Sequence, residues 1–478
     1  MLWAMATSNT ATDSAVPLEA GAVEALASSF RGALIRPGDR TYDEHRRVWN
    51  GSIDRYPALI ARCAGVEDVI AAVRFARIHG LLVAVRGGGH SYPGYSVCDG
   101  GMVIDLSLMK RIHVDPETRT VRVQAGVLLG ELDRETQAFG FAVPAGFVSH
   151  TGVAGLTLGG GIGFTMRKFG LTIDNLLSVD LITAQGEFLK ASEHENADLF
   201  WGVRGGGGNF GIVTEFEFRL NPLGPQVFAG PIFWPMDEAP SVLSFYRDWI
   251  ADCPDELMTL IVERRAPALP AMPPDLVGQR VVAVVCVYAG SVDEGEEVVR
   301  PLKGFRPPAL DLCAPMPFVT HQQMYDAAYP RGWRYYFRSC DVAELNDDII
   351  DVMVDYGHRI ESSITSLALW QMGGAVSRVG EGETAFNGRR AGHTFNINGN
   401  TMTAEGFAQE REWARGLWTA LEPYHTSVYV NFLMEEGEDR VRQAYGAAKY
   451  DRLRTLKRKY DPDNFFRLNQ NIPPAEIS

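Results

Sequence analysis

The chain has 478 residues, of which 46% are hydrophobic and 22% charged, an ordinary globular composition with room for two to three domains. Its formal net charge of -14 argues against a nucleic-acid or anionic-membrane partner. The N-terminus lacks the pattern of a signal peptide, and no run of about 20 apolar residues predicts a membrane span. The six cysteines are scattered, so we expect free thiols, a cytoplasmic location and no metal site.

The elements predicted in the first half of the chain are short strands that alternate with helices. Residues 1–25 are expected to form a loose tail. A helix is predicted at 65–79, because apolar residues recur on one face and Gly80 follows as a terminator. Pro222 and Pro225 mark a domain boundary. The other predictions for this half are strands at 57–62, 81–86, 102–106, 120–124 and 216–220, and a helix at 127–139.

From about residue 226 the strands and helices become longer, which predicts a separate sheet covered by helices. The basic run from Arg452 to Lys459 is expected to be a solvated helix face, with neutralisation of cofactor phosphates as the alternative. The predictions for this half are strands at 279–290 and 362–374, and helices at 291–302, 403–424 and 441–460.

Three glycine-rich stretches lie within about 125 residues, at 86–91, 144–163 and 201–218. Glycine runs weaken helices and strands, and they persist where the backbone must approach a ligand closely. Backbone amides in such turns donate to anions, so three runs favour an extended anionic cofactor over ordinary tight turns.

The third stretch contains Gly206-Gly207-Gly208-Asn209-Phe210-Gly211, which fits the GxGxxG pattern of dinucleotide-binding proteins. That fingerprint requires a helix after the glycines, so that the helix N-terminus faces the pyrophosphate. Here IVTEFEFRL follows, which predicts a strand. The pattern therefore does not indicate a Rossmann site.

RGGGHS, GVAGLTLGGGIG and LFWGVRGGGGNFGIVTEFEF together resemble the flavin domain of the vanillyl-alcohol oxidase and p-cresol methylhydroxylase superfamily. The C-terminal YVNF and AYGAAKYDRLRTLKRKYDPDNFFRLNQNI resemble the end of berberine bridge enzyme-like oxidases. The resemblance covers about half of the chain, in the family's order.

The resemblance implies an α+β fold, in which a two-subdomain FAD-binding domain of the p-cresol methylhydroxylase type precedes an antiparallel-sheet substrate domain flanked by helices. The expected parts are a tail (1–25), the FAD-binding domain (26–225), the substrate-binding domain (226–428) and a C-terminal segment that returns to the FAD domain (429–478).

His90 is the residue that the resemblance implies as a covalent anchor, bonded to the 8α carbon of the flavin. Some relatives have a second bond to a cysteine, but Val148 stands at the matching position, so we expect monocovalent FAD. Asn175 has a helix cap with Asp174 as its alternative role. The other cofactor-binding residues implied by the resemblance are Arg86, Gly87, Gly88, Gly89, Ser91, Gly146, His150, Thr151, Gly152, Gly155, Gly159, Gly161, Gly163, Ile212, Val213, Asn469 and Asn471.

The catalytic base is not identified by the resemblance, because relatives have a tyrosine where this chain has Phe432. Tyr429 is the nearest hydroxyl, although strand alternation would place it on the opposite face from Phe432. Tyr336 and His393 are the other candidate bases. Candidate substrate contacts, on the idea of an aromatic-lined pocket, are Trp370, Tyr335, Asn396, Asn398 and Phe432.

The function predicted from this combination is FAD-dependent oxidation of a small organic molecule, such as a secondary metabolite, an alcohol, an amine or a sugar. Molecular oxygen is the expected final acceptor and hydrogen peroxide the expected product. A dehydrogenase with another acceptor is one alternative. A resistance protein that sequesters a small molecule is the other, because Phe432 removes the usual base. The sequence leaves the substrate and the oligomeric state open.

Overall fold

A four-stranded sheet opens the N-terminal domain of the computed structural model, which describes residues 18–476. Three of its strands are parallel, and the N-terminal strand is antiparallel to them. Helix α3 (Val66–Ile78) covers this sheet with its predicted apolar face, and Val69 and Val73 are fully buried. The order across the sheet is β1 (Ala33–Ile35), β2 (Leu59–Arg62), β4 (Met102–Asp105) and β3 (Val83–Arg86).

A five-stranded antiparallel sheet forms the other half of this domain. One continuous hydrophobic core joins the two sheets, since Ile104 of the first and Phe216 of the second belong to the same buried cluster. The order across the sheet is β5 (Ile112–Asp115), β6 (Thr120–Gln124), β10 (Ile212–Arg219), β8 (Leu176–Ile182) and β9 (Phe188–Ser192). The connecting elements are α2 (Tyr42–Arg46), α4 (Leu129–Gln137), β7 (Phe141–Ala142), α5 (Val153–Leu158), α6 (Met166–Phe169), α7 (Ala197–Val203) and β11 (Asn221–Pro222).

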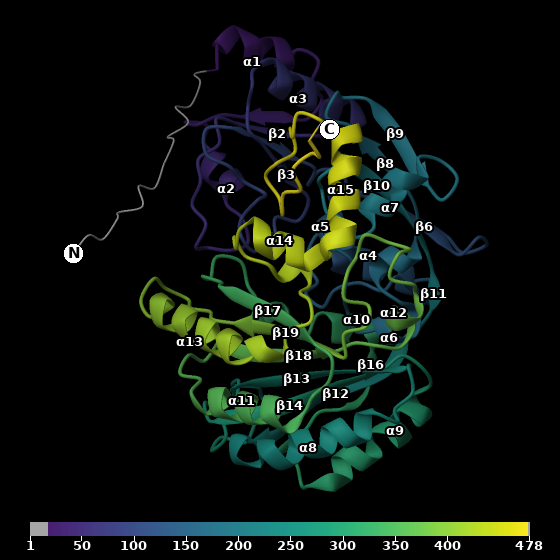
Figure 1. Cartoon of the computed structure of the whole chain (residues 1–478), viewed down its shortest axis with the longest axis vertical. Coiled ribbons are helices and arrows are strands. Elements are labelled where there is room, and N and C mark those ends of the chain that lie inside the picture. Colours follow the sequence, from purple (N-terminus) through teal and green to yellow (C-terminus); the bar gives the residue numbers. More distant parts are fainter. Residues whose placement is uncertain (1–17, 477–478) are drawn as a thin grey trace.

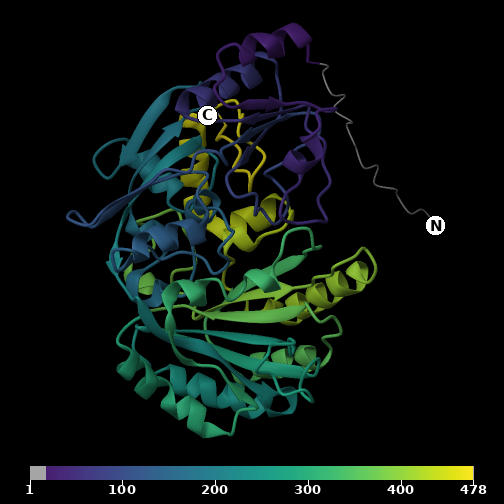
Figure 2. The same ribbon diagram turned by 180° about the vertical axis from the view of Figure 1, so that it is seen from behind.

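The second domain is built on one large antiparallel sheet, whose long helices pack on the face away from the N-terminal domain (Figures 1 and 2). Two short helices lie on the other face, toward the N-terminal domain. Alternation along β13 (Leu257–Arg265) puts Ile261 into the core under the helices and Leu260 into the core that faces the N-terminal domain. The other strands are β12 (Gln226–Pro235), β14 (Arg280–Tyr288), β15 (Leu310–Asp311), β16 (Ala314–Pro317), β17 (Phe337–Val342), β18 (Ser366–Gln371) and β19 (His393–Asn398). The helices are α8 (Ala239–Ile250), α9 (Val292–Phe305), α10 (Phe318–Gln322), α11 (Asp347–His358), α12 (Ala375–Arg378) and α13 (Phe407–Ala420).

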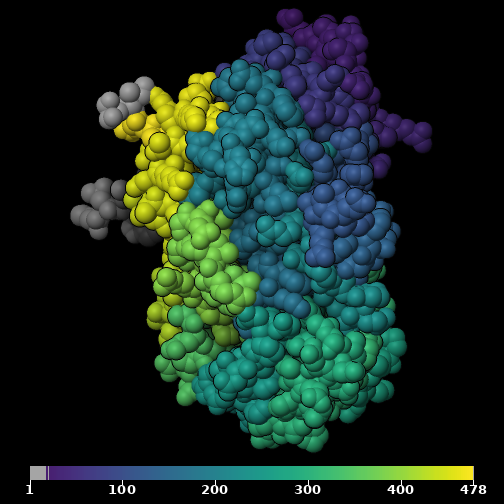
Figure 3. Space-filling model, turned by 90° about the vertical axis from the view of Figure 1, so that its right-hand side faces the viewer, coloured from purple at the N-terminus to yellow at the C-terminus, as the bar shows by residue number. Residues whose placement is uncertain are grey.

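The C-terminal segment returns to the N-terminal domain and lies along its surface, as the yellow region of Figure 3 shows. The single helix predicted at 441–460 is wrong, because the segment forms two helices, α14 (Glu438–Tyr445) and α15 (Ala447–Tyr460). Gly446 breaks the run with a φ of 71°, a conformation that glycine adopts without strain.

The predicted tail was too long. Residues 1–17 lie outside the described part of the chain, but helix α1 (Ala20–Ala27) includes residues 20–25. Val23 and Leu26 of this helix are buried in the N-terminal core, close to α3. Among residues 18–476, no helix has the length and apolarity needed to span a bilayer.

Candidate active site

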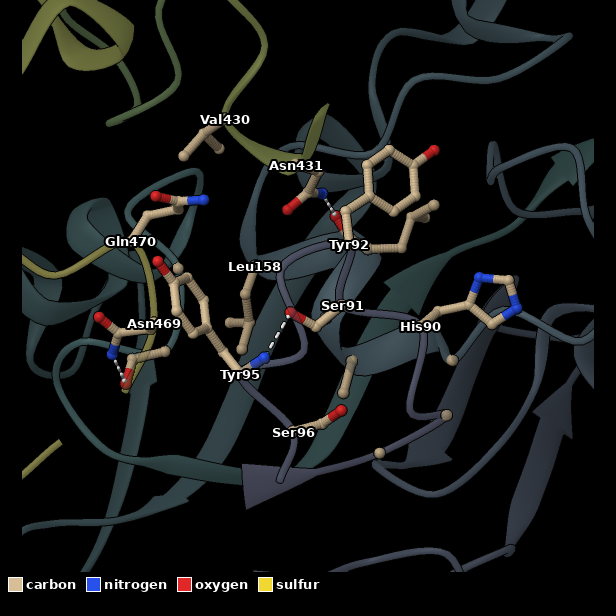
Figure 4. A pocket seen from close by; sticks show the side chains of 18 of the residues that line it. His90, Ser91, Tyr92, Tyr95, Ser96, Leu158, Val430, Asn431, Asn469 and Gln470 are labelled. Atoms are coloured by element: carbon tan, nitrogen blue, oxygen red, sulfur yellow. Dashed lines mark hydrogen bonds between the residues drawn. The ribbon is translucent and has the colours of Figure 1, made fainter. Parts of the chain in front are cut away.

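A deep cavity lies where the two domains and the returning C-terminal segment meet. The close-up in Figure 4 shows Tyr92 and Asn431 from opposite segments beside one another, with Asn469 and Gln470 on another wall. Most of the lining comes from four groups of residues: the loop Gly87–Ser96, residues of the stretches 146–162 and 207–213, C-terminal residues within 429–433 and 466–470, and Tyr329 with Asn396 from the second domain. The remaining lining residues are Trp49, Val83, Val85, Leu106 and Tyr445.

The first glycine stretch follows β3 directly, and its middle glycine has no space for a side chain. A Cβ atom on Gly88 would lie 2.3 Å from the backbone nitrogen of Gly152, so the first and second stretches touch through their backbones. Buried Arg86 does not line the cavity; its guanidinium donates to backbone carbonyls of His45 and Ser96 and so fixes the loop.

His90 projects from this loop into the cavity wall. Its ring stacks on Trp49 with centroids 4.4 Å apart, and its Nε2 lies 2.6 Å from Nδ1 of His150. Burial, with smaller contributions from His150 and Arg331, lowers the pKa of His90 well below its ordinary value. The imidazole is therefore neutral at physiological pH and has a nitrogen lone pair available. The sequence analysis placed both His90 and His150 near the cofactor, but it did not predict that the two rings contact each other.

The third glycine stretch leads into β10, a strand, which confirms that the GxGxxG match lacks the helix of a Rossmann site. Ile212 and Val213 line the cavity at the start of this strand. Asn209 ties the loop to the C-terminal segment: its Nδ2 donates to Gln470 O at 3.2 Å, and its Oδ1 accepts from Ile472 N at 3.0 Å.

FAD fits this cavity by the chemistry of its walls. Residues from all three glycine stretches line one space, where their backbone amides can donate to a pyrophosphate. The hydroxyl of Tyr445 and Oδ1 of Asn469 line the space and are buried, and neither has a hydrogen-bond partner among the described residues. Buried polar atoms normally have partners, so these two atoms indicate that a polar ligand completes the site.

Most of the residues proposed for the cofactor from the sequence line the cavity. Asn175 does not: its amide donates to Phe169 O and Leu171 O and its oxygen accepts from Asn221, so its role is structural, close to the alternative considered for it. His150, Gly159, Gly161, Gly163 and Asn471 also lie outside the lining, although His150 contacts His90, which does line the cavity. The three glycines are required for packing, since a Cβ on any of them would lie 2.1 Å or less from a neighbouring atom.

Tyr429 and Phe432 both line the cavity, but the strand expected for them is wrong. Residues Val430–Phe432 form one turn of 3-10 helix, and the two rings meet edge to face with centroids 4.8 Å apart. The Tyr429 hydroxyl accepts from Gly161 N at 3.0 Å and from the Asn431 amide at 2.9 Å. Burial raises the pKa of Tyr429, so it is a poor base at neutral pH.

Tyr336 and His393 do not reach the cavity. Tyr336 lies in the hydrophobic cluster under the helices. His393 starts β19, and its ring lies near Tyr246 of α8 in the same layer. Neither can act on a molecule in the cavity, because the sheet separates them from it. The sequence could not distinguish the two faces of strands that are buried on both sides.

The structure places some of the predicted substrate contacts at the cavity and others away from it. Phe432 and Asn396 line the cavity, and Trp370 lines a small adjoining recess. Tyr335 lies behind the cavity wall, where its ring stacks on Trp49 with centroids 3.8 Å apart. The amide of Asn398 donates to the hydroxyl of Ser366 on the neighbouring strand β18.

Several cavity residues were missed by the sequence analysis. Tyr92 and Tyr95 follow the RGGGHS motif directly, so their proximity was the signal that could have identified them. Trp49, Tyr329 and Asn431 reach the site only through tertiary structure. Tyr92 packs parallel to Phe432 with centroids 5.9 Å apart, and Asn396 lines the cavity together with them.

Comparison with known proteins agrees with this geometry. Residues 57–192 match the model of an FAD binding domain, and residues 428–473 match the model described as berberine and berberine like. An FAD-linked oxidoreductase of Dictyostelium discoideum is 32% identical over 95% of this chain and 97% of its own length. This chain belongs to the berberine bridge enzyme-like FAD-linked oxidoreductases.

Other members of the family are similar to this chain over nearly their full length. The (R)-6-hydroxynicotine oxidase of Paenarthrobacter nicotinovorans is 32% identical over 93% of this chain and 97% of its own. The crystal structure of 6-hydroxy-D-nicotine oxidase from Arthrobacter nicotinovorans has a TM-score of 0.85 and covers 94% of this chain and 99% of its own, at 30% identity. A berberine bridge enzyme-like protein of Physcomitrella patens also scores 0.85, at 25% identity over 95% and 100% of the two chains. The predicted α+β fold, the enzyme class and FAD binding are thereby confirmed.

Proposed function

We propose that this FAD-linked oxidoreductase is an oxidase with a single covalent bond between His90 and the 8α carbon of its flavin. The bound FAD supplies the hydride acceptor for a small organic substrate, and molecular oxygen is the final acceptor, giving hydrogen peroxide. The observation that carries the proposal is a neutral, buried His90 in the wall of the cavity, in contact with His150.

The surroundings of His90 support the bond. A neutral imidazole nitrogen is the nucleophilic form, and His150 at 2.6 Å would accept the proton that His90 loses on bonding to the 8α carbon. The new C–N bond would replace a C–H bond of the 8α methyl group, so that two electrons would pass to the flavin ring and from there to molecular oxygen. Stacking on Trp49 holds the ring in one orientation. All six cysteines lie among the described residues and none lines the cavity, which supports one covalent bond rather than two. Their free thiols also favour the expected cytoplasmic location.

The substrate end of the cavity has Tyr92, Asn396 and Phe432 in place of an ionisable base. Burial raises the pKa of Tyr92, so its hydroxyl stays protonated at neutral pH and acts as a hydrogen-bonding group. We propose that these residues orient the substrate. The names of relatives that oxidise 6-hydroxynicotine and xylooligosaccharides place small amines and sugars among the candidates.

The test is anaerobic mixing of the purified protein with panels of alcohols, amines and sugars, followed by admission of oxygen. An oxidase loses the visible absorbance of its oxidised flavin on mixing, and it then releases one peroxide per substrate oxidised once oxygen is admitted. Reoxidation by an artificial acceptor but not by oxygen would identify a dehydrogenase instead. Spectral perturbation without bleaching by every compound would contradict catalysis.

A further inference from the structure

A small recess adjoins the cavity on the sheet of the second domain. Its volume is about 20 Å³, and it shares Phe147, Tyr329 and Asn396 with the main cavity, so it is a side chamber of the same site. By the same measure one water molecule needs roughly 10–15 Å³, so the recess takes one compact terminal group. Its floor consists of alternate residues of two paired strands, Leu260, Val262 and Arg264 of β13 and Ser366, Ala368 and Trp370 of β18.

Arg264 brings a positive charge to this floor without a counter-charge. In the described part of the chain no carboxylate lies within ion-pair distance of it; its guanidinium donates only to backbone carbonyls, those of Arg265 at 3.2 Å and Ser363 at 3.4 Å. Burial lowers the pKa of Arg264, as expected for a cation without a partner anion. The neighbouring Arg265 differs, since Glu361 lies 3.6 Å from it.

Two further donors in the recess are unsatisfied. The indole Nε1 of Trp370, a residue that is 1% exposed, has no hydrogen-bond partner among the described residues, and neither has the buried Tyr325 hydroxyl. Both residues line the recess together with Arg264. A cation and two unpaired donors around one small space are complementary to a compact anion with several acceptor positions.

We propose that Arg264, Trp370 and Tyr325 bind a carboxylate of the substrate, so that the enzyme oxidises a small organic acid. A carboxylate has the size of the recess and the two oxygens that a guanidinium prefers. The rest of the substrate then lies in the main cavity between Phe147 and Asn396, whose Oδ1 is buried and unpaired and is available to a hydroxyl or amine on the substrate. This inference rests on the proposed oxidase function and specifies its substrate class.

The experiment uses the flavin-loaded protein and two pairs of probes, benzoate with benzamide and phenylacetate with phenylacetamide. Each acid and its amide have the same shape and differ in charge. Dissociation constants are measured by titration calorimetry and by perturbation of the flavin spectrum. The variants are Arg264→Gln, which removes the charge, Arg264→Lys, which keeps it, and Arg265→Gln as the matched control. Flavin content and melting temperature are recorded for each.

We expect at least one acid to bind about tenfold or more tightly than its amide. Arg264→Gln should weaken the binding of that acid by a similar factor and leave the affinity for the amide unchanged. The affinity of Arg264→Lys for the acid should lie between those of Arg264→Gln and the parent protein. Arg265→Gln should bind the acid as tightly as the parent protein. Equal affinity of acids and amides, absence of acid binding, or no effect of Arg264→Gln would overturn the proposal. Loss of FAD in Arg264→Gln would also overturn it, because Arg264 would then hold the cofactor. Oxidation of neutral substrates alone would contradict the acid class while leaving the oxidase function intact.

Discussion

His90 and His150 form a pair whose geometry suits covalent attachment, and the pair makes a prediction at the scale of one residue. We expect His150→Gln to bind FAD but to form the covalent bond at least about tenfold more slowly, because a proton acceptor 2.6 Å from His90 is lost. The measurement is the covalent fraction over time after apoprotein is mixed with FAD. An unchanged rate would show that His150 only supports the ring.

Tyr92 should contribute to turnover through its hydroxyl. We expect Tyr92→Phe to lower kcat/KM about tenfold, the effect of removing one hydrogen bond to the substrate. Tyr335→Phe is the matched control, since that hydroxyl is bonded to Pro330 O and lies behind the wall. Steady-state kinetics on the identified substrate measures both. Equal losses in the two variants would contradict a direct role for Tyr92.

Glu263 predicts a pH dependence of stability. It is fully buried under the helices without a hydrogen-bond partner among the described residues, and burial raises its pKa well above the ordinary value. The folded protein therefore keeps a proton that the unfolded chain releases above about pH 4.5, so this group lowers the free energy of unfolding as pH rises through that window, by about 1.4 kcal/mol per pH unit.

Glu263→Gln replaces the carboxyl with an amide that does not titrate. The melting temperature of this variant should therefore decline less between pH 5 and 8 than that of the parent protein. The control is Glu361→Gln, whose side chain is 61% exposed and should leave the profile unchanged. Parallel profiles for the parent and Glu263→Gln would show that the carboxyl is not held protonated in the fold.

Helix α15 docks the C-terminal segment through a buried ion pair, which corrects the expectation of a uniformly solvated basic face. Lys457 is fully buried and donates to Asp461 at 2.7 Å, to Asn209 O at 2.7 Å and to Phe466 O at 2.9 Å. The same residue therefore joins the helix, the third glycine stretch and the last cavity wall. Lys459, two residues further along the helix, is 60% exposed and pairs with Asp198 at the surface.

Lys457→Met should lower the free energy of unfolding by about 3–5 kcal/mol, because Asp461 stays buried without its partner. Lys459→Met is the matched control and should cost at most about 1 kcal/mol, as for an exposed pair. Urea denaturation of the two variants measures the difference. Similar midpoints would contradict the account of the docked helix.

At this scale the sequence predicted the elements whose pattern is local. The apolar face of α3, the strand β14 and the helix α9 follow from periodicity and terminators, and they formed as expected. The split at Gly446 was missed because the apolar pattern continues across it and a single glycine is compatible with a helix. The turn at Val430–Phe432 was missed because three residues contain no period.

Across the whole molecule, the part of the site that the sequence predicted is the part carried by contiguous motifs. The sequence analysis identified the glycine stretches, His90, Ile212 and Val213, because residues that are contiguous in one motif line the cavity together. The substrate end combines single residues from distant segments, Trp49, Tyr329 and Arg264 among them, whose meeting depends on how the second domain closes over the first. Neither spacing nor composition encodes that arrangement.

The covalent tether is the central claim, and the most direct measurement is the mass of the intact protein after acid denaturation, beside flavin fluorescence in a denaturing gel. The account predicts a fluorescent band and a mass increase of one FAD, both lost in His90→Ala while the fold persists. Flavin that washes away from the parent protein, or a covalent adduct that survives in His90→Ala, would contradict it.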